Sequence, residues 1–185
     1  MDDESAVAAY LETRDPEVFR LLVERYDRRV LSLVASVLGP HADLDAEEVA
    51  QEVFVRLHEK LPTFRGEARF GSWLYRLAYN RAVEHRRRAR IRMPHLSLDA
   101  LETAVRSHAS DAAGELERNQ LVARLVEQLP GLYRTMIYMR YWLDCPVAEI
   151  AETLAVPSGT VKSYLSRARD RLRQRAMAEG IEWLG

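Results

Sequence analysis

Apolar residues recur at helical spacing along most of the chain, and Gly and Pro fall where these stripes stop. After Asp15, which can serve as an N-cap ahead of Pro16, one stripe continues to Gly39. It contains Phe19, Leu22, Val23, Tyr26, Val30, Leu33, Val34 and Val37. A second stripe follows Asp45, which is placed to cap its helix, and contains Val49, Ala50, Val53, Leu57 and Leu61. Strand-like alternation is absent, so the pattern predicts an all-α protein.

The remaining helices fall on both sides of a segment with weak periodicity. A third helix is expected from about Ser72, after the loop PTFRGEARFG, and it continues into an arginine-rich run. Two further pairs of helices are expected at 116–143 and 146–177, with breaks at Pro130-Gly131 and at 155–157. We therefore predict two small helical domains, residues 1–93 and 114–185, joined by a flexible linker at 94–113.

Composition narrows the class of protein. With 185 residues, 48% of them hydrophobic, the chain can form real cores and is not a disordered tail protein. The single cysteine, Cys145, excludes an internal disulfide and a Cys-rich zinc site, and we expect it to be a small buried residue. No apolar run approaches the roughly 18 residues of a membrane span, and the acidic start is no signal peptide. A cytoplasmic protein without membrane insertion is expected.

The formal net charge of −1 hides an uneven distribution. Residues 65–92 carry nine arginines against two glutamates, a net of +7, and residues 160–175 carry six bases against one aspartate, a net of +5. Acidic residues gather at 2–4, 43–52 and 99–117. A single basic run is often only a solvated helix face, but two separate runs on amphipathic helices favour nucleic-acid binding.

The second basic run lies in PVAEIAETLAVPSGTVKSYLSRARDRLR, which is typical of a helix-turn-helix. Ala151 is small enough for helix contact, and Ser158 or Thr160 can cap the second helix. Apolar positions that can lock the helices are Ile150, Leu154, Val156, Val161 and Leu165. The opposite face carries Thr160, Ser163, Ser166, Arg167 and Asp170, while Arg169, Arg171 and Arg173 suit phosphates. The alternative is an ordinary helical hairpin whose second helix ends in a basic segment.

The third helix of the first domain carries an unusual strip. Trp73, Arg76, Asn80 and Arg87 fall within an arc of roughly 60° at helical spacing. An aromatic, arginines and an amide on one strip suit stacking on unpaired bases and phosphate neutralisation. The preceding loop adds Phe64, Arg65 and Phe70, close enough to flank a splayed base. The alternative is that Trp73 and Phe70 are simply core residues.

The second helix presents a different outer surface. Phe54 and Val55 stand among charged residues and exceed what the core stripe needs, which suggests an exposed apolar spot for a protein partner. The alternative is that a small helical domain encloses Phe54.

Two strings closely resemble bacterial extracytoplasmic-function sigma factors, the smallest sigma-70-type factors, which keep only regions 2 and 4. They are DAEEVAQEVFVRLHEKLPTFRGEARFGSWLYRLAYNRAVEHRRR and LPGLYRTMIYMRYWLDCPVAEIAETLAVPSGTVKSYLSRARDRLR. The resemblance covers about 19–173 except the linker. It implies a factor that binds core RNA polymerase, directs it to promoters and promotes DNA opening.

The resemblance also assigns roles to individual positions. Region 2.2 would bind the β′ clamp helices through Asp45, Glu48, Gln51, Glu52, Phe54 and Arg56. Regions 2.3 and 2.4 would hold the −10 element through Phe64, Arg65, Phe70, Trp73, Arg76, Asn80, Arg81 and Arg87. Region 4 would contact the β flap and read the −35 element through Thr160, Lys162, Ser163, Ser166, Arg167 and Arg169. The linker would run through the polymerase, and an anti-sigma factor would control the protein.

Three positions depart from the family pattern. Gly71 stands where Ser or a larger residue is usual, Ala155 replaces the glycine of the turn, and Tyr164 replaces a frequent arginine. We therefore expect a looser start of the third helix, an ordinary residue in a strained turn, and no carried-over phosphate contact at Tyr164.

Nothing in the sequence assembles an enzyme. The histidines are scattered, HExxH and P-loop patterns are absent, and the lone cysteine has no evident His partner. We expect no catalytic residues, no metal site and no cofactor. The other readings are a helix-turn-helix regulator of duplex DNA, which needs no Trp-Arg-Asn strip, and a scaffold or anti-sigma-type protein, which leaves both basic runs unexplained.

Overall fold

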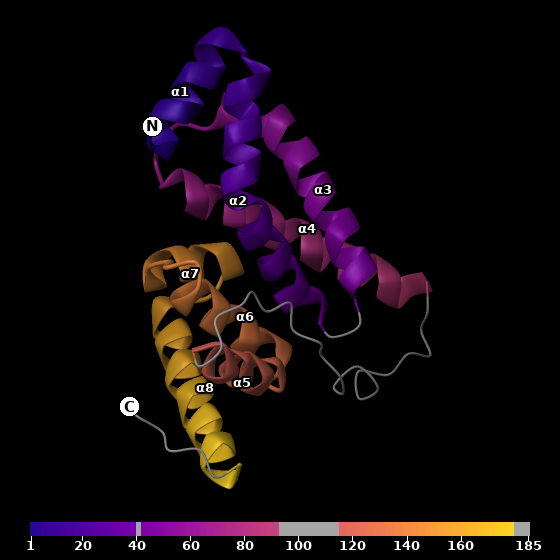
Figure 1. Cartoon of the computed structure of the whole chain (residues 1–185), viewed down its shortest axis with the longest axis vertical. Coiled ribbons are helices and arrows are strands. Elements are labelled where there is room, and N and C mark those ends of the chain that lie inside the picture. Colours follow the sequence, from indigo (N-terminus) through magenta and orange to yellow (C-terminus); the bar gives the residue numbers. More distant parts are fainter. Residues whose placement is uncertain (40–41, 93–114, 180–185) are drawn as a thin grey trace. The chain divides into compact units, whose positions relative to one another are not determined.

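The computed structural model describes residues 1–39, 42–92 and 115–179. Within these ranges the regular elements are α-helices and one 3-10 turn (Figure 1), which confirms the all-α fold class. The chain divides into two compact units. Unit 1 comprises 1–38 and 42–93, and unit 2 comprises 39–41 and 94–185. The predicted linker at 94–113 lies outside the described residues.

Unit 1 is built around its second helix. The elements are α1 (Asp3–Thr13), α2 (Pro16–Leu38), α3 (Asp43–Lys60), the 3-10 turn η1 (Leu61–Thr63) and α4 (Phe70–Arg92). Helix α2 packs against α1, α3 and α4, and α3 also packs against α4 (Figure 1). The predicted core stripe of α3 is confirmed, since Val49, Ala50, Val53, Leu57 and Leu61 are all buried.

The predicted ends of α2 are also confirmed. The Asp15 Oδ1 accepts the backbone N–H of Glu17 at 2.9 Å, and Pro16 is the first helical residue. Gly39 follows the last turn with φ of +99°, a conformation that glycine adopts without the steric cost of a Cβ. An N-cap acceptor and a C-terminal glycine thus bound the longest apolar stripe.

Helices α3 and α4 both begin earlier than the sequence pattern suggests, α3 with its N-cap three residues before Asp45 and α4 two residues before Ser72. Ala42 is the N-cap of α3, so Asp45 lies inside the first turn and does not cap the helix. Helix α4 begins at Phe70 rather than near Ser72, and the Trp73 N–H donates to the Arg69 carbonyl at 3.1 Å. Gly71 is therefore helical. A Cβ there would stand 2.9 Å from the Tyr26 hydroxyl, so the glycine admits this tyrosine.

The sequence pattern did not predict α1. Its N-cap is Asp2, whose Oδ1 accepts the Ser5 N–H at 2.7 Å, and this hydrogen bond lowers the pKa of Asp2. Ala6, Val7 and Tyr10 are buried against the rest of unit 1. Asp3 forms an ion pair with Arg25 and accepts a hydrogen bond from the Tyr26 hydroxyl. These contacts come from residues more than 20 positions away, which no local pattern reveals.

Unit 2 is organised by its last helix. Its elements are α5 (Glu115–Glu127), α6 (Gly131–Tyr141), α7 (Val147–Leu154) and α8 (Ser158–Ala178), which match the expected pairs and their breaks. Helix α8 packs against α5, α6 and α7, and the α7–α8 pair forms the predicted helix-turn-helix (Figure 1). The core contains Met136, Met139, Ile150, Val161 and Leu165, all buried. Cys145 forms no disulfide and is buried, as expected.

The turn between α7 and α8 differs from the prediction at one end. Ala155 takes the left-handed conformation at the C-cap of α7, with φ 53° and ψ 45°, so an ordinary residue does occupy the strained bend. At the start of α8, however, the N-cap is Pro157 and no side chain caps the helix. The Pro157 carbonyl instead accepts the Thr160 N–H at 2.9 Å, and Ser158 lies inside the helix. The expectation of a Ser158 or Thr160 cap is wrong.

No helix in the described parts of the chain is sufficiently long and apolar to cross a membrane.

Candidate polymerase and promoter interfaces

Helix α8 turns its predicted base-reading residues away from the core of unit 2. Val161, Leu165 and Ala168 are buried on one side of the helix. On the other side Lys162, Ser163, Ser166, Arg167 and Arg169 are exposed, and Thr160 is half-buried. None of these cations forms an ion pair with a described residue. The outer face of α8, which also carries the exposed Asp170, therefore offers a net positive charge beside two serine hydroxyls, a donor set that suits duplex DNA.

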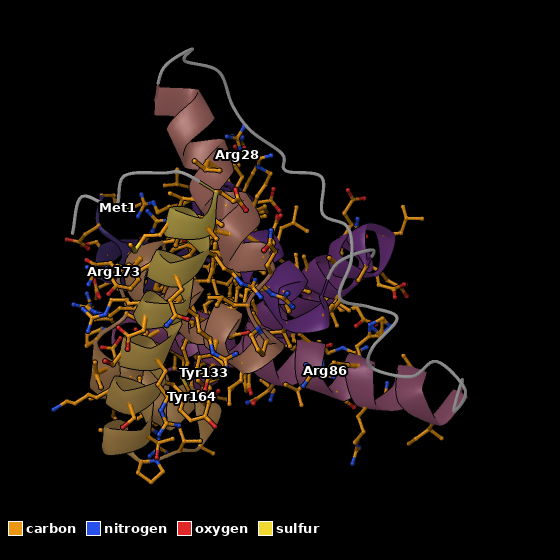
Figure 2. All side chains as sticks on the ribbon, turned by 90° about the horizontal axis from the view of Figure 1, so that it is seen from below. Met1, Arg28, Arg86, Tyr133, Tyr164 and Arg173 are labelled. Atoms are coloured by element: carbon orange, nitrogen blue, oxygen red, sulfur yellow. The ribbon has the colours of Figure 1, made fainter. Side chains whose placement is uncertain are left out.

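Tyr164 belongs to a cluster on the surface of unit 2. Its ring lies 4.7 Å from that of Tyr133 on α6, at 31° between the planes (Figure 2). The Arg171 guanidinium lies 4.9 Å from the centre of the Tyr133 ring, within cation–π range. Tyr164 thus packs against α6. Arg171 is held by an aromatic ring of its own unit.

A hollow of about 270 Å³ lies between α3, η1 and α4. It brings together the predicted Trp73, Arg76 and Asn80. The other lining residues are Arg56, Lys60, Thr63, Leu77, Arg81 and Glu84. The Trp73 side chain is half-buried and its ring lies 5.3 Å from Phe64, while Asn80 is exposed. The volume lies just below the range of small-ligand pockets, about 300–1,000 Å³. The walls combine an aromatic face, an amide and cationic groups.

Phe70 is a core residue, which corrects the expectation that it flanks a base. It is 0% exposed and packs edge-on against Tyr26 at 5.4 Å and Phe64 at 5.8 Å. Because α4 already begins at Phe70, its side chain is directed into unit 1 by the helix rather than presented on a loop. Phe64 is half-buried and remains close to Trp73, so it keeps a partly open aromatic surface.

Arg81 is likewise not free to bind a phosphate, against the sequence expectation. Its side chain is 8% exposed, its Nε donates to a Glu52 carboxylate oxygen, and its Nη1 donates to Glu84 Oε2 at 3.3 Å. Two other arginines of α4 are also bonded within the unit. Arg86 Nη1 donates to the Val37 carbonyl at 3.1 Å, and Arg88 Nη2 donates to Glu84 Oε1 at 2.6 Å.

Two of the expected DNA-binding arginines in unit 1 do remain available. Arg65 lies on the loop before α4 and Arg87 lies on α4; both are exposed and form no ion pair with a described residue. The Glu52 partner of Arg81 lies 29 positions away on α3. Only tertiary packing distinguishes the paired from the unpaired arginines, so the sequence carries no local signal for this difference.

The outer surface of α3 carries most of the predicted polymerase-binding set. Asp45, Glu48 and Gln51 are exposed, and Glu52, Phe54 and Arg56 are half-buried. Val55 is 60% exposed, so α3 does expose an apolar residue among charges. Leu44, which the sequence reasoning missed, is 83% exposed. It lies 11 residues before Val55, which places the two on nearly the same face, three turns apart. The sequence did carry a signal for Leu44, because it is an apolar residue that precedes the core stripe of α3.

Comparison with known proteins identifies the family. A model of sigma-70 region 2 matches residues 22–91, and a model of sigma-70 region 4 matches residues 119–172. The chain is 34% identical over 168 residues to the ECF RNA polymerase sigma-E factor of Escherichia coli strain K12, covering 85% of this chain and 86% of the relative. The chain belongs to the ECF RNA polymerase sigma factors. It is also 30% identical over 172 residues to the ECF sigma factor SigW of Bacillus subtilis strain 168, covering 86% of this chain and 89% of SigW.

Membership of the sigma factor family establishes the function that the sequence predicted. This ECF sigma factor binds core RNA polymerase, directs it to specific promoters and promotes DNA opening for transcription initiation. Among the described residues, no group of three or more His, Cys, Asp or Glu side chains is placed to hold a metal ion.

Two solved sigma factor structures share the fold. CnrH in complex with the cytosolic domain of CnrY has a TM-score of 0.63 at 23% identity, covering 95% of this chain and 97% of CnrH. The sigma factor RpoE in complex with the anti-sigma factor NepR from Bartonella quintana has a TM-score of 0.67 at 19% identity, covering 84% of this chain and 94% of RpoE. At these identities the likeness concerns the fold.

Proposed function

We propose that the two units of this sigma factor divide promoter recognition between them. Unit 1 binds the β′ clamp helices through α3 and captures the opened −10 element on α4. Unit 2 binds the β flap and reads the −35 element as duplex through α8. The observation that carries this division is the contrast between a lined hollow on unit 1 and an exposed basic helix face on unit 2.

The hollow of unit 1 suits a base that has left the stack. Trp73 supplies a half-buried aromatic face, and the exposed Asn80 supplies donors and an acceptor at the rim. Stacking of a base on an aromatic side chain contributes about 1–3 kcal/mol, comparable to the few kcal/mol needed to unstack it. Capture can therefore drive opening without any covalent chemistry. The exposed Arg65 and Arg87 would hold the backbone of the captured strand.

Helix α8 suits the major groove of duplex DNA. Ser163, Ser166 and Arg167 lie on its exposed side, and an arginine there can bind a guanine edge with two hydrogen bonds. Lys162 and Arg169 would neutralise phosphates, and Thr160 would lie near the backbone at the start of the helix.

The polymerase-binding surface is the exposed side of α3. On this side the apolar Leu44 and Val55 lie three turns apart, with Asp45, Glu48 and Gln51 along the stretch between them, so the surface offers two separate apolar contacts among polar groups. Phe54 and Arg56 add partly buried contacts at its edge. We further propose that an anti-sigma factor controls the protein by covering these surfaces. The two solved relatives are complexes with CnrY and with the anti-sigma factor NepR. The site of action is then the cytoplasm, where core polymerase meets promoter DNA.

Run-off transcription with bacterial core RNA polymerase tests the division. Promoters are first selected from a randomised library with the wild-type holoenzyme. Trp73→Ala and Asn80→Ala should then reduce strand opening, read by 2-aminopurine fluorescence in the −10 element, while −35 duplex binding is retained. Arg28→Ala, which removes an exposed arginine of α2, is the control and should change neither. Unchanged opening in both hollow variants would contradict base capture there.

A further inference from the structure

A network of charged side chains joins α3 to α4 along the wall of the hollow. Arg81 of α4 is at its centre, bonded to Glu52 of α3 through Nε and Nη2 and to Glu84 of its own helix through Nη1 at 3.3 Å. Glu84 in turn pairs with Arg56 of α3 at 3.5 Å and with Arg88 at 2.6 Å. Glu52 and Arg56, which are one turn apart on α3, are thus bonded to arginine and glutamate side chains within two turns of α4.

The geometry of Arg81 separates it from the other cations of the hollow. With 8% of its side chain exposed, the guanidinium is removed from solvent and depends on its carboxylate partners. Two of its nitrogens are directed at Glu52, an arrangement that fixes the orientation of the planar group as well as its charge. A guanidinium held in this way positions its neighbours, and its burial and its bonds to two carboxylates direct it into the unit rather than outward to a phosphate.

The network lies between the two helices that line the hollow, α3, which is proposed to bind polymerase, and α4, which is proposed to capture the base. Arg56 and Lys60 on α3 face the hollow from one side, and Trp73 and Asn80 on α4 line it from the other. Arg81 spans these walls, since it is anchored on α4 and bonded to Glu52 on α3. Loss of this connection would loosen the α3–α4 spacing at the hollow while the packed faces of the helices still hold them together, because the remaining inter-helix pair of the network, Arg56–Glu84, is longer and more exposed.

We infer that Arg81 is a positioning residue that sets the α3–α4 spacing at the hollow through Glu52 and thereby links the polymerase-binding helix to the base-capturing helix. The inference rests on the proposed function of the hollow, and it goes further by naming how that site is held open. Glu52 and Arg56 belong to the edge of the proposed polymerase surface, and both are partly exposed. Polymerase contact at α3 therefore reaches the hollow through this network.

A double-mutant cycle in the holoenzyme tests the inference. The variants are Arg81→Met, Glu52→Gln and the two combined, measured at saturating core polymerase. The probe is a fork-junction DNA carrying a library-selected −10 strand with 2-aminopurine. Each single variant should weaken fork binding about tenfold, and the double variant should be no weaker than either, because both remove the same connection. Arg81→Lys should recover only part of the loss, since an ammonium cannot make the paired bonds.

Salt dependence separates positioning from direct DNA contact. Arg81→Met should leave the slope of log affinity against log salt unchanged, whereas loss of a phosphate contact lowers it by about 1. Arg28→Met on α2 is the matched control and should leave fork binding unaltered. Additive losses of about a hundredfold, or a lowered slope in Arg81→Met, would overturn the inference. Where circular dichroism shows that Arg81→Met does not fold, unchanged fork binding in both Glu52→Gln and Arg81→Lys would overturn it instead.

The same measurement distinguishes failure of the proposed function from failure of this inference. Trp73→Ala and Asn80→Ala remove base contacts without touching the network. Unchanged fork binding in these two variants shows that the base binds elsewhere, whatever the outcome of the cycle. Weakened fork binding in them, together with additive effects of Arg81 and Glu52, leaves base capture intact and removes the positioning role.

Discussion

The two basic helices of this sigma factor differ in how several of their arginines are used. On α4, Arg81, Arg86 and Arg88 are bonded to acceptors within unit 1. On α8, Arg167, Arg169 and Arg173 are exposed and form no ion pair with a described residue. The sequence assigns the larger net charge to the first run, +7 against +5. Folding reverses the comparison, because much of the charge on α4 stabilises the unit that carries it.

This difference matches the DNA that each helix is proposed to bind. Duplex DNA has a regular line of phosphates, which an exposed row of cations can neutralise with counterion release. A single base drawn from the stack needs a rigid aromatic wall and fixed polar groups, and ion pairs inside the protein help to hold those walls. Charge on α8 therefore acts outward on the ligand, and charge on α4 acts mainly inward on the shape of the hollow.

The largest effect is expected at the buried end of α4. Phe70→Ala removes a fully buried ring and should destabilise unit 1 by about 3–5 kcal/mol, as truncation of core aromatics does. Chemical denaturation followed by tryptophan fluorescence measures this loss. Phe64→Ala, at the half-buried neighbour, should cost less stability and weaken −10 strand binding instead. Equal stability losses for the two phenylalanines would contradict the assignment of Phe70 to the core.

Arg167 and Arg86 provide the direct contrast between the helices. Arg167→Ala should weaken −35 duplex binding by about 1–3 kcal/mol, the contribution of a good bidentate contact to a base. Arg86→Ala should leave −35 binding unchanged and reduce the stability of unit 1 by about 1 kcal/mol, since its hydrogen bond to the Val37 carbonyl is lost. Fluorescence anisotropy and thermal unfolding measure the two quantities. An unaltered duplex affinity in Arg167→Ala would show that another residue reads the base.

How much of this the sequence could predict depends on the range of the interaction. Local signals sufficed for the helix-turn-helix, the Asp15 cap and the buried stripe of α3, because each depends on neighbours within one or two turns. Helix α1 was missed although Asp2 offers a local N-cap, because its buried face and the contacts of Asp3 with Arg25 and Tyr26 depend on another helix.

The residues at the hollow of unit 1 were also predictable only where local spacing decides their position. Trp73, Arg76 and Asn80 share a face by helical periodicity, and the structure brings them to one hollow. Arg81 lies next in sequence but is turned toward Glu52, and Phe70 is turned toward Tyr26. Residue type and spacing cannot separate an arginine that binds DNA from one that binds a distant carboxylate. That distinction needs the packing of α3 against α4.

The turn that presents α8 offers a smaller test. Ala155 adopts φ of 53°, where an L-residue is strained by roughly 1–2 kcal/mol and glycine is not. Ala155→Gly should therefore stabilise unit 2, by up to about 1 kcal/mol after the greater entropy loss of glycine is subtracted. Thermal unfolding measures the gain, and −35 affinity should stay the same. A lower melting temperature would mean that the bend is not strained.

The smallest expected effect is a difference between α8 and α4 in how the salt concentration changes DNA affinity. Arg169→Ala removes an unpaired cation of α8, so the slope of log affinity against log salt for −35 duplex should fall by about 1. The deficit of the variant relative to wild type should then shrink by about threefold to fourfold between 50 and 200 mM salt. Arg88→Ala on α4 is the counterpart, and fork-junction binding should keep its slope because Glu84 already pairs with Arg88. If both variants lowered their slopes equally, α4 would carry outward charge as α8 does, and the contrast between the helices would not hold.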